Sequence, residues 1–373
     1  MITIKLFSGF EEEGKTSMYY YSRQLEHSLK SNEQVHYNVE NYFPKYKWLF
    51  LARIVGELNL FRINKYVVNP INVRMLKRDV NHIIDHTNAH LIFSLGRKRS
   101  VITVHDIIPL KRSKGLISGL SPVRYPLLFK LSLTFMNKAS KIVAVSQSTK
   151  NDLVEHCFID SSRIEVIYNP INPEFRRLEN FDLALEKEKL GIKNSKSFII
   201  LLVGSLEYKN HNNALLAISD LELTHGYDIQ VIILKASSFD LYINTLDYQL
   251  SKRVIVLSNL SLNEVCMLYN VSDCLLFPSF YEGFGWPPLE AVSCGTPVIV
   301  SDIPVLRETL SEIGIFINPN DVSSITRGLK HVIDNIDSVL FDIENYSEKL
   351  KLKFSKEKFL SKYLSLYNEV LGE

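Results

Sequence analysis

The feature that most constrains this chain is an alternation of short apolar runs with helix-like segments along its whole length. The apolar runs are rich in Val, Ile and Leu, and most are unbroken rather than alternating with polar residues. Strands that are buried on both faces have this pattern, and they occur in parallel sheets covered by helices. Strand, helix and strand in repeated succession are typical of α/β folds. We therefore predict an α/β protein with doubly wound parallel sheets.

The runs expected to form strands fall into two groups of six. They cover residues 2–7, 35–39, 82–85, 101–106, 141–146, 164–168, 197–204, 228–234, 254–259, 274–279, 297–301 and 314–318. Pro170 and Pro173 follow the sixth run and favour a stiff connector over another strand. A chain of 373 residues also suits two domains. We predict a Rossmann-like N-terminal domain over residues 1–175 and a second Rossmann-like domain over residues 176–373.

The two predicted domains are expected to face each other across a cleft. In doubly wound sheets, ligands bind beyond the carboxyl ends of the strands, so the motifs that follow strands are the candidates for a site. Residues 355–370 carry apolar side chains at helical spacing, and Ser355 is a suitable N-cap. We expect this helix to close the C-terminal domain and to brace the pair.

Composition and cysteine content bound the class of protein. Hydrophobic residues make up 46% and charged residues 23% of the chain, as in ordinary soluble globular proteins. The N-terminus is too short and strand-like for a signal peptide, and no apolar run reaches the roughly 18 residues of a spanning helix. The four cysteines form no Cys-x-x-Cys pair and have no histidines at zinc spacing. We expect a cytoplasmic protein with scattered buried thiols, namely Cys157, Cys266, Cys274 and Cys294.

Charge is distributed unevenly along the chain. Residues 41–130 hold 16 Lys and Arg against four Asp and Glu, which gives this stretch a charge of about +12, whereas the whole chain carries +2. Between residues 48 and 61, apolar side chains interleave with basic ones, as in an interfacial amphipathic helix. A core-facing helix and a solvated basic face explain the same patterns. Peripheral contact of the first domain with an anionic membrane is one expectation.

The most informative string is Phe-Pro-Ser-Phe-Tyr-Glu-Gly-Phe-Gly-Trp-Pro-Pro-Leu-Glu-Ala at residues 277–291. Its two glycines let backbone N–H groups approach a ligand, and Pro287 suits the first turn of a helix. The N-terminus of such a helix favours a phosphate. Glu282 can accept hydrogen bonds from sugar hydroxyls, and Glu290 can accept them from the two hydroxyls of a ribose. A tight turn with a surface glutamate is the simpler interpretation of the same residues.

The string from Glu282 to Ala291 resembles the signature of the large retaining glycosyltransferase family four, the glycosyl transferases group 1. The following residues 294–302, Cys-Gly-Thr-Pro-Val-Ile-Val-Ser-Asp, are similar to that family as well. The resemblance implies the two-Rossmann-domain GT-B architecture, with Glu282 on the donor sugar and Glu290 on the ribose. It further implies that the donor is bound by Gly283, Phe284, Gly285 and Leu289.

Residues 203–211, Val-Gly-Ser-Leu-Glu-Tyr-Lys-Asn-His, resemble the phosphate-binding turn of the family. This resemblance implies that Gly204, Ser205 and Lys209 bind the donor diphosphate. Lys209 would neutralise the diphosphate as it leaves. A solvated lysine near a helix end is the alternative.

In the first half, residues 82–90 and 104–109 resemble segments of many family members. The resemblance implies that His105 lies close to the donor sugar. It also implies an acceptor side that includes Gly9, Asp85, His86 and Asp106. Buried structural histidines would account for the same segments.

Three departures from the family pattern concern the acceptor side and the phosphate turn. Acidic residues occupy positions 11–13 of the first loop, where small residues are common, and the phosphate turn keeps Lys209 but lacks the arginine that many members have before it. Pro170 stands where a glycine is frequent. None of the three affects the string from Glu282 to Glu290.

The chain has no two aspartates separated by one residue, so it lacks the Asp-x-Asp device that holds a metal in other transferases. Helix N-termini, backbone amides and Lys209 would stabilise the leaving diphosphate instead. We expect activity without a metal and without a cofactor. The resemblance alone implies retention of the anomeric configuration, and both a same-face attack and a two-step route would give it.

The sequence predicts an enzyme that transfers a hexose, mannose or glucose, from a nucleotide diphosphate sugar. The expected acceptor is a cell-envelope polysaccharide or a lipid-linked saccharide. A nucleotide-sugar epimerase of the same fold and a non-catalytic nucleotide-sugar-binding protein are the alternatives. Nucleic-acid binding is not expected, because no stacking aromatics occur at fixed spacing within the basic stretch.

Overall fold

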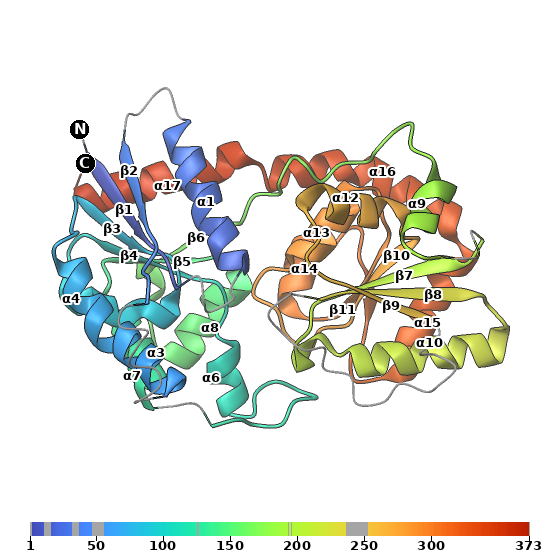
Figure 1. The fold of residues 1–373 in the computed structure, drawn as a ribbon, viewed down its shortest axis with the longest axis horizontal. Coiled ribbons are helices and arrows are strands. Elements are labelled where there is room, and N and C mark those ends of the chain that lie inside the picture. Colours follow the sequence, from blue (N-terminus) through green and yellow to red (C-terminus); the bar gives the residue numbers. More distant parts are fainter. Residues whose placement is uncertain are drawn as a thin grey trace. The chain divides into compact units, whose positions relative to one another are not determined.

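The computed structural model describes residues 2–10, 16–31, 37–46, 56–124, 127–192, 194, 196–235 and 253–372. Contacts between residues divide the chain into two compact units (Figure 1). Unit 1 contains Met1–Ser113, Val123–Asn169 and Lys356–Glu373, and unit 2 contains Lys114–Pro122 and Pro170–Ser355. The chain therefore passes from one unit to the other at the proline-containing connector, and also on either side of Lys114–Pro122 and after Ser355.

Unit 1 is built on six parallel strands in the order β2-β1-β3-β4-β5-β6. The strands are β1 (Thr3–Phe7), β2 (Asn38–Tyr42), β3 (Val80–Ile83), β4 (Ser100–Val104), β5 (Lys141–Ala144) and β6 (Ile164–Val166). The helices are α1 (Thr16–Lys30), α3 (Glu57–Ile63), the π-helix η3 (Asn64–Val68), α4 (Asn69–Arg74), the 3-10 helix η4 (His86–Leu91), α5 (Ile92–Leu95), α6 (Ile108–Ser113), α7 (Leu127–Phe135), the 3-10 helices η5 (Met136–Lys138) and η6 (Ser161–Arg163), α8 (Gln147–Cys157) and α17 (Lys356–Leu371). Every residue of β3 and β4 is buried, as expected for strands covered on both faces.

Unit 2 is built on a second sheet of six parallel strands, in the order β12-β11-β10-β7-β8-β9. The strands are β7 (Phe198–Val203), β8 (Ile229–Leu234), β9 (Val254–Leu257), β10 (Cys274–Phe277), β11 (Val298–Ser301) and β12 (Ile315–Ile317). The helices are α9 (Leu183–Lys189), the 3-10 helix η7 (Glu207–Lys209), α10 (His211–His225), α12 (Leu262–Val271), α13 (Trp286–Ser293), α14 (Pro304–Leu310), α15 (Val322–Asp334) and α16 (Ile336–Lys353). Read in chain order, this sheet has the 3-2-1-4-5-6 arrangement of the Rossmann fold. The predicted α/β class with two parallel sheets is confirmed.

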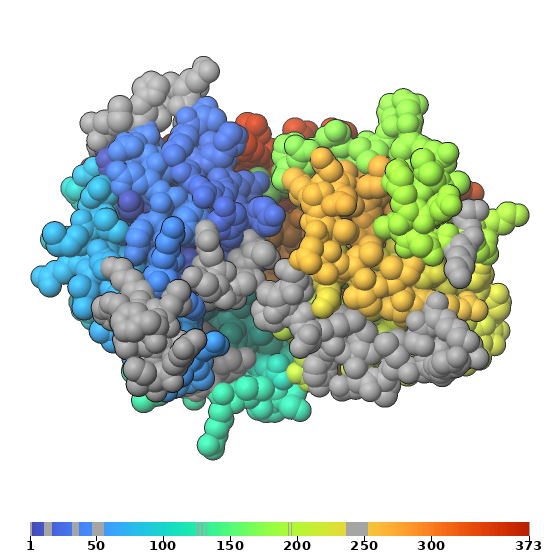
Figure 2. Space-filling model, viewed as in Figure 1, coloured from blue at the N-terminus to red at the C-terminus, as the bar shows by residue number. Residues whose placement is uncertain are grey.

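The segment Lys114–Pro122 belongs to unit 2 although it lies between two stretches of unit 1 in the sequence. Ser118 donates a hydrogen bond from Oγ to Asn320 Oδ1 over 3.2 Å. A Cβ atom added at Gly119 would lie 2.3 Å from the Phe280 ring, so the backbone of the segment runs directly against that ring. Most of the segment is exposed, and it reaches the surface in the teal part of Figure 2.

The last helix, α17, packs on the sheet of unit 1 through a buried polar network. Tyr367 Oη lies 2.7 Å from His82 Nδ1, and Thr103 Oγ1 lies 2.8 Å from His82 Nε2. Tyr363 and Tyr21 are hydrogen-bonded through their hydroxyls. Burial lowers the pKa of His82 to about 3, so this imidazole is neutral. The predicted assignment of this helix to the second domain therefore differs from the contacts.

The predicted amphipathic segment lies only in part within the described residues. Trp48, Leu49, Phe50 and Ile54 lie outside them, as do the acidic residues 11–13 of the first loop. Within α3, Leu60 is buried whereas Leu58 is 62% exposed. None of the described helices has the length and apolarity that crossing a membrane requires.

Two of the four thiols are neighbours rather than scattered. Cys266 Sγ in α12 lies 3.9 Å from Cys294 Sγ, at the end of α13. Both are buried, as is Cys274, whereas Cys157 is half-buried. The expectation of burial is confirmed for three thiols, and the pair shows that α12 and α13 pack closely at this point.

Candidate active site

The strand order of unit 2 singles out one position for a ligand. The chain winds in one direction from β7 to β9 and in the other from β10 to β12, so the direction reverses between the adjacent strands β7 and β10. In open α/β sheets, ligands bind at such a reversal, beyond the carboxyl ends of the strands. The loops that follow β7 and β10 carry Lys209 and Glu282.

Lys209 and Glu282 are brought together at this position. Lys209 Nζ lies 2.7 Å from Glu282 Oε1, and the two side chains are 12% and 10% exposed. The ammonium also lies 4.5 Å from the centre of the Phe277 ring. The backbone fixes the two loops to each other, because Phe280 donates its N–H to Tyr208 O over 2.9 Å. Lys209 and Glu282 thus form a nearly buried ion pair between two loops that are linked by a backbone hydrogen bond.

Gly204 ends β7 and makes room for the lysine. Its φ is +114°, a conformation that favours glycine. A Cβ atom here would lie 2.7 Å from Lys209 Cγ and 2.8 Å from Lys209 Cε. The aliphatic part of the lysine therefore lies directly on the glycine backbone, and the adjacent Ser205 is buried.

The turn after Lys209 places the start of α10 beside the pair. Asn210 adopts a left-handed conformation with φ +60°, and its side chain donates to Pro278 O and Pro319 O over 3.1 and 2.8 Å. His211 follows as the first residue of α10 and is buried. Burial and the positive charge of Lys209 lower the pKa of His211 to about 4, so the imidazole is neutral near Lys209.

As predicted, the loop that begins at Glu282 contains two glycines and leads directly into a helix with proline in its first turn, α13. Gly285 has φ +89° and directly precedes α13, and a Cβ atom there would lie 2.7 Å from Leu306 Cδ2. Phe284 packs edge-on against Phe354, with ring centres 5.6 Å apart. Gly283 and Leu289 are buried, the latter completely. The structure thus makes Leu289 a core residue of unit 2.

The first turn of α13 offers fewer backbone donors than an ordinary helix. Residues 287 and 288 are both proline and have no N–H group. Backbone donors for an anion at this helix start must therefore come from Trp286, Leu289 and the glycine-containing loop before them.

Glu290 lies one turn into α13 and has a tyrosine partner. Tyr269 in α12 donates its hydroxyl to Glu290 Oε2 over 2.9 Å. Glu290 remains half-buried. Desolvation by the surrounding protein raises the pKa of its carboxyl to about 7, against the lowering effect of the Tyr269 hydrogen bond. A carboxyl with this pKa changes charge near neutral pH.

In unit 1, the predicted residues also follow the carboxyl ends of adjacent strands. His105 comes directly after β4 and is 6% exposed; its Nε2 lies 2.9 Å from Ile84 O, so it donates to that carbonyl. Its ring stands edge-on to Tyr21 at 4.7 Å. Asp106 Oδ1 accepts the N–H of Ile108 over 2.9 Å at the start of α6. His105 and Asp106 are therefore held by local backbone contacts.

The remaining acceptor-side residues cluster beyond β1 and β3. Asp85 caps η4 and accepts the N–H of Thr87 over 2.9 Å, and the buried His86 has its Nδ1 3.5 Å from Asp85 Oδ1. A Cβ atom at Gly9 would lie 3.6 Å from Asn88 Nδ2, which places Gly9 beside η4. The direction of winding reverses between β1 and β3 as well, and beyond the carboxyl ends of strands at such a reversal open α/β sheets usually bind their ligands.

Three supporting residues were not predicted. Tyr269 donates a hydrogen bond to Glu290, His211 is affected by the charge of Lys209, and Phe280 donates the backbone hydrogen bond that links the two loops. Tyr269 gave no signal, because its partner lies 21 positions away on another helix. His211 stood within the quoted phosphate-turn string, and its place directly after Lys209 was the available signal.

Comparison with known families decides the class. The Glycosyltransferase Family 4 model matches residues 35–175, and the Glycosyl transferases group 1 model matches residues 185–349. This chain belongs to glycosyltransferase family four. The predicted membership is confirmed, and the protein is a glycosyltransferase.

Curated relatives of this glycosyltransferase include enzymes of polysaccharide synthesis. The O-antigen chain mannosyltransferase RfbU of Salmonella typhimurium is 29% identical over 265 residues, which cover 69% of this chain and 70% of RfbU. The serotype-specific mannosyltransferase WbdA of Escherichia coli is 27% identical over 240 residues, which cover 63% of this chain but 29% of WbdA. The matched part is thus about two thirds of this chain, 70% of RfbU and less than a third of WbdA.

Solved structures show the same fold. The structure of Alr3699/HepE from Anabaena, in complex with UDP and glucose, superposes with a TM-score of 0.72 at 15% identity. The superposition covers 99% of this glycosyltransferase and 100% of HepE. The GT-B fold predicted for this glycosyltransferase is therefore confirmed.

Proposed function

We propose that this glycosyltransferase moves a hexose, mannose in the first place, from a nucleotide diphosphate sugar to a cell-envelope polysaccharide or lipid-linked saccharide. The proposed reaction retains the anomeric configuration and uses no metal ion. Mannose is favoured over glucose because RfbU and WbdA are both named mannosyltransferases. Retention follows the resemblance to the family.

The observation that carries the proposal is the Lys209–Glu282 pair at the reversal point of the second sheet. A nearly buried lysine beyond β7 supplies positive charge where a Rossmann-type sheet binds its ligand. A carboxylate on the neighbouring loop supplies two acceptor oxygens for hydroxyl groups. A nucleotide diphosphate sugar carries an anionic diphosphate and sugar hydroxyls. Lys209 can bind the first, and Glu282 can accept hydrogen bonds from the second.

The ion pair also suggests what changes when the donor binds. In the structure, the ammonium of Lys209 and the carboxylate of Glu282 pair with each other at 2.7 Å. A diphosphate near Lys209 would compete for the ammonium, because charge-assisted hydrogen bonds to phosphate are strong. Glu282 would then be free to accept a hydroxyl of the donor sugar. In this proposal, Lys209 stabilises the charge that develops on the diphosphate as the sugar leaves.

Further residues take roles that extend this arrangement. Glu290 would bind the ribose diol, with Tyr269 orienting its carboxyl, and Gly283 to Gly285 would let the backbone approach the phosphates. His105 would position the donor sugar. Gly9, Asp85, His86 and Asp106, beyond the first sheet, would form the acceptor side. The uneven charge of the first unit would favour peripheral contact with an anionic membrane.

The proposal is tested by turnover of a panel of nucleotide diphosphate sugars, with and without a chelator, followed by identification of the released sugar. We expect one donor, a mannose donor, to be hydrolysed slowly in the presence of the chelator and to be transferred when a saccharide acceptor is added. An epimerase would release a changed sugar or nucleotide sugar without any acceptor. Loss of all turnover on removal of divalent metal would contradict the metal-independent mechanism.

A further inference from the structure

A hollow of about 410 Å³ in unit 1 lies at the edge of the sheet opposite to the candidate site. Its lining comes from the residues that enter three adjacent strands: Arg97 and Lys98 precede β4, Lys138 to Ser140 precede β5, and Arg163 precedes β6. The hollow is therefore at the amino ends of these parallel strands. Neither the family resemblance nor the proposed reaction uses this edge.

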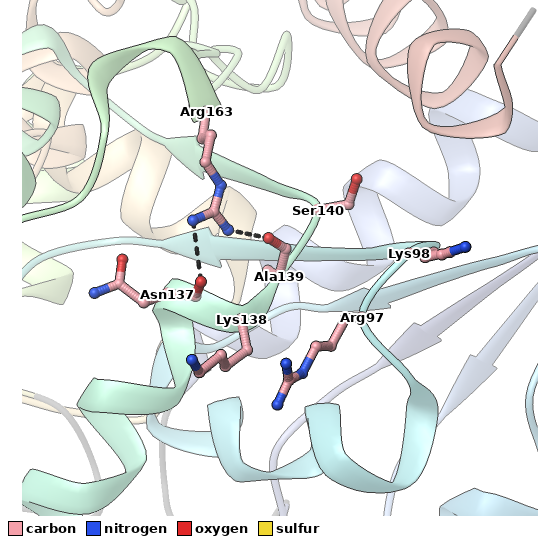
Figure 3. A pocket seen from close by; sticks show the side chains of 7 residues that line it. All are labelled: Arg97, Lys98, Asn137, Lys138, Ala139, Ser140 and Arg163. Carbon is pink, nitrogen blue, oxygen red and sulfur yellow. Dashed lines mark hydrogen bonds between the residues drawn. The ribbon is translucent and has the colours of Figure 1, made fainter.

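The hollow is lined by cations that lack counter-ions. Arg97, Lys98 and Lys138 are exposed, and no ion pair within the described part of the chain involves them. The adjacent Arg99 differs, because its guanidinium lies 3.7 Å from Asp79. Figure 3 shows the side chains of Arg97 and Lys138 extending in the same direction from neighbouring loops. Like charges gathered without partners repel one another, so an anion placed among them would be stabilised.

Arg163 holds one side of the hollow in place through hydrogen bonds to the backbone. Its guanidinium donates to Asn137 O over 3.0 Å and to Ala139 O, as the dashed lines of Figure 3 show. These bonds hold the turn that carries Lys138 against the start of β6. The backbone that carries Lys138 is thus fixed by these hydrogen bonds.

An exposed apolar stripe leads to the hollow along α7. Leu127, Leu131 and Phe135 are spaced four residues apart and so share one face of the helix, and Lys138 follows in η5. Leu127 is 71% and Leu131 is 41% exposed, whereas Phe135 is half-buried and packs against the core of unit 1. Phe135 stands edge-on to Phe93 at 4.5 Å, and Phe93 itself is 58% exposed. The aromatic pair joins the apolar stripe to the loop with Arg97 and Lys98.

We infer that this surface, formed by the α7 stripe and the cations of the hollow, binds an anionic phospholipid membrane. Exposed leucine and phenylalanine side chains beside unpaired basic residues are the combination that interfacial membrane contact requires. The inference names the surface for the peripheral contact in the proposed function, and it does not depend on the transfer reaction.

The test is sedimentation with vesicles of phosphatidylcholine that contain about one third phosphatidylglycerol, at low ionic strength. The variant K98Q/K138Q should bind about 30-fold more weakly than wild type, since each basic residue near an anionic surface contributes about 1 kcal/mol. The matched control K196Q/K349Q removes two exposed lysines of unit 2 and should bind like wild type. Equal binding of K98Q/K138Q and wild type would overturn the inference.

A second pair of variants tests the apolar stripe. L127S/L131S should also weaken vesicle binding, whereas L223S/L352S, which alters two leucines of unit 2 that are 85% and 67% exposed, should not. Equal binding of wild type to vesicles of phosphatidylcholine alone would contradict a role for the cations. Inorganic phosphate that stabilises wild type but not K98Q/K138Q, without any vesicle binding, would replace the membrane by a small anion.

The vesicle assay separates this inference from the proposed reaction. Slow hydrolysis of the donor in solution should be the same in K98Q/K138Q and wild type. K209A should bind vesicles as wild type does, although its turnover is expected to fall. Failure of one proposal is therefore visible independently of the other.

Discussion

Lys209 owes its position to three contacts, of which one is nearby in the sequence and two are about 70 positions away. Its aliphatic chain rests on Gly204, its ammonium pairs with Glu282, and the ring of Phe277 lies 4.5 Å from that ammonium. The glycine and the lysine were recognised together as a phosphate turn, whereas the pairing with Glu282, 73 positions away, follows only from the adjacency of β7 and β10. A sequence supplies the residue types of such a site, and the sheet order decides which of them meet.

Replacement of Lys209 by Ala should lower kcat about 10²- to 10³-fold, the usual cost of removing one group that stabilises transition-state charge. The reason is that, among the described residues, Lys209 is the cation that forms an ion pair with Glu282. Turnover of the best donor in saturating amounts measures the effect. K196A, which removes an exposed lysine of the same unit, serves as the control and should leave kcat unchanged. An unaltered kcat in K209A would remove this residue from the site.

Replacement of Gly204 by Ala should displace Lys209, because the added Cβ would lie 2.7 Å from Lys209 Cγ. We expect the donor affinity to fall at least about tenfold, or 1.4 kcal/mol. G191A is a matched control: Gly191 also has a positive φ, +81°, but nothing lies within 4 Å of its added Cβ. Both variants carry backbone strain of about 1–2 kcal/mol, and only G204A should lose donor affinity in a calorimetric titration. Equal affinities in the two variants would show that the glycine contact is unimportant.

Glu290 should make donor binding depend on pH. Its carboxyl has a pKa of about 7, raised above the ordinary value by desolvation, and the ionised form is the better acceptor for a ribose diol. Affinity for a nucleotide sugar should therefore rise as pH increases through 7, by about tenfold between pH 6 and pH 8. The free energy of unfolding depends on pH in the opposite direction to the donor affinity. The raised pKa of Glu290 stabilises the folded state below about pH 4.5, and this contribution is lost as pH rises to about 7.

The control for this pH dependence is E290Q, which should bind more weakly and with a flatter pH profile. A nucleotide sugar is the appropriate ligand, because the terminal phosphate of a free nucleotide titrates near pH 6 itself. A wild-type affinity that is constant from pH 6 to pH 8 would contradict the ribose role of Glu290.

At the scale of elements, the apolar runs of the sequence predicted where the strands lie, but they did not predict which sheet the C-terminal helix packs against. Every predicted run overlaps a strand, since buried parallel strands need unbroken β-branched residues, although several runs extend two residues too far and the run at 82–85 shares only residues 82 and 83 with β3. The second run was expected at residues 35–39, whereas β2 covers Asn38–Tyr42, an edge strand in which only Val39 is buried. An edge strand with one buried residue has little apolar pattern to mark its register.

The partner of α17 could not be read from its apolar face. That face predicts a buried helix, and it does not say which sheet buries it. Buried polar atoms determine which sheet α17 packs on. His82 lies in β3, between β1 and β4, and both of its ring nitrogens need partners, which Tyr367 and Thr103 provide. The attachment of the chain end to unit 1 thus rests on one buried histidine and the tyrosines of α17.

Replacement of Tyr367 by Phe should destabilise the first sheet by about 1–3 kcal/mol, because it leaves a buried imidazole nitrogen without a partner. Amide hydrogen exchange of β3 and β4 measures the local free energy of opening. Y20F, which changes a tyrosine that is 65% exposed in α1, should have no effect. Unchanged protection of β3 in Y367F would mean that the His82 bond contributes nothing to the attachment of α17.

At the scale of the whole molecule, two sheets of six parallel strands carry different parts of the proposed reaction. The pair of charges, the carboxylate proposed for the ribose and the glycine-containing loop all belong to unit 2, so this unit contains every group proposed to bind the donor except His105. Unit 1 contributes the basic hollow at one edge of its sheet, and at the other edge His105 and the residues proposed for the acceptor side. We therefore expect unit 2 to bind most of the donor, and unit 1 to contact the membrane and the acceptor.

The most direct test of this account is the melting temperature of the wild-type protein with nucleotide diphosphate sugars in the presence of a chelator. A donor at about a hundred times its dissociation constant should add about 2.7 kcal/mol to the free energy of unfolding, and a mannose donor is expected to give the largest shift. K209A should lose most of that shift. No shift with any nucleotide sugar at millimolar concentration would contradict the assignment of Lys209, Glu282 and Glu290 as a donor site.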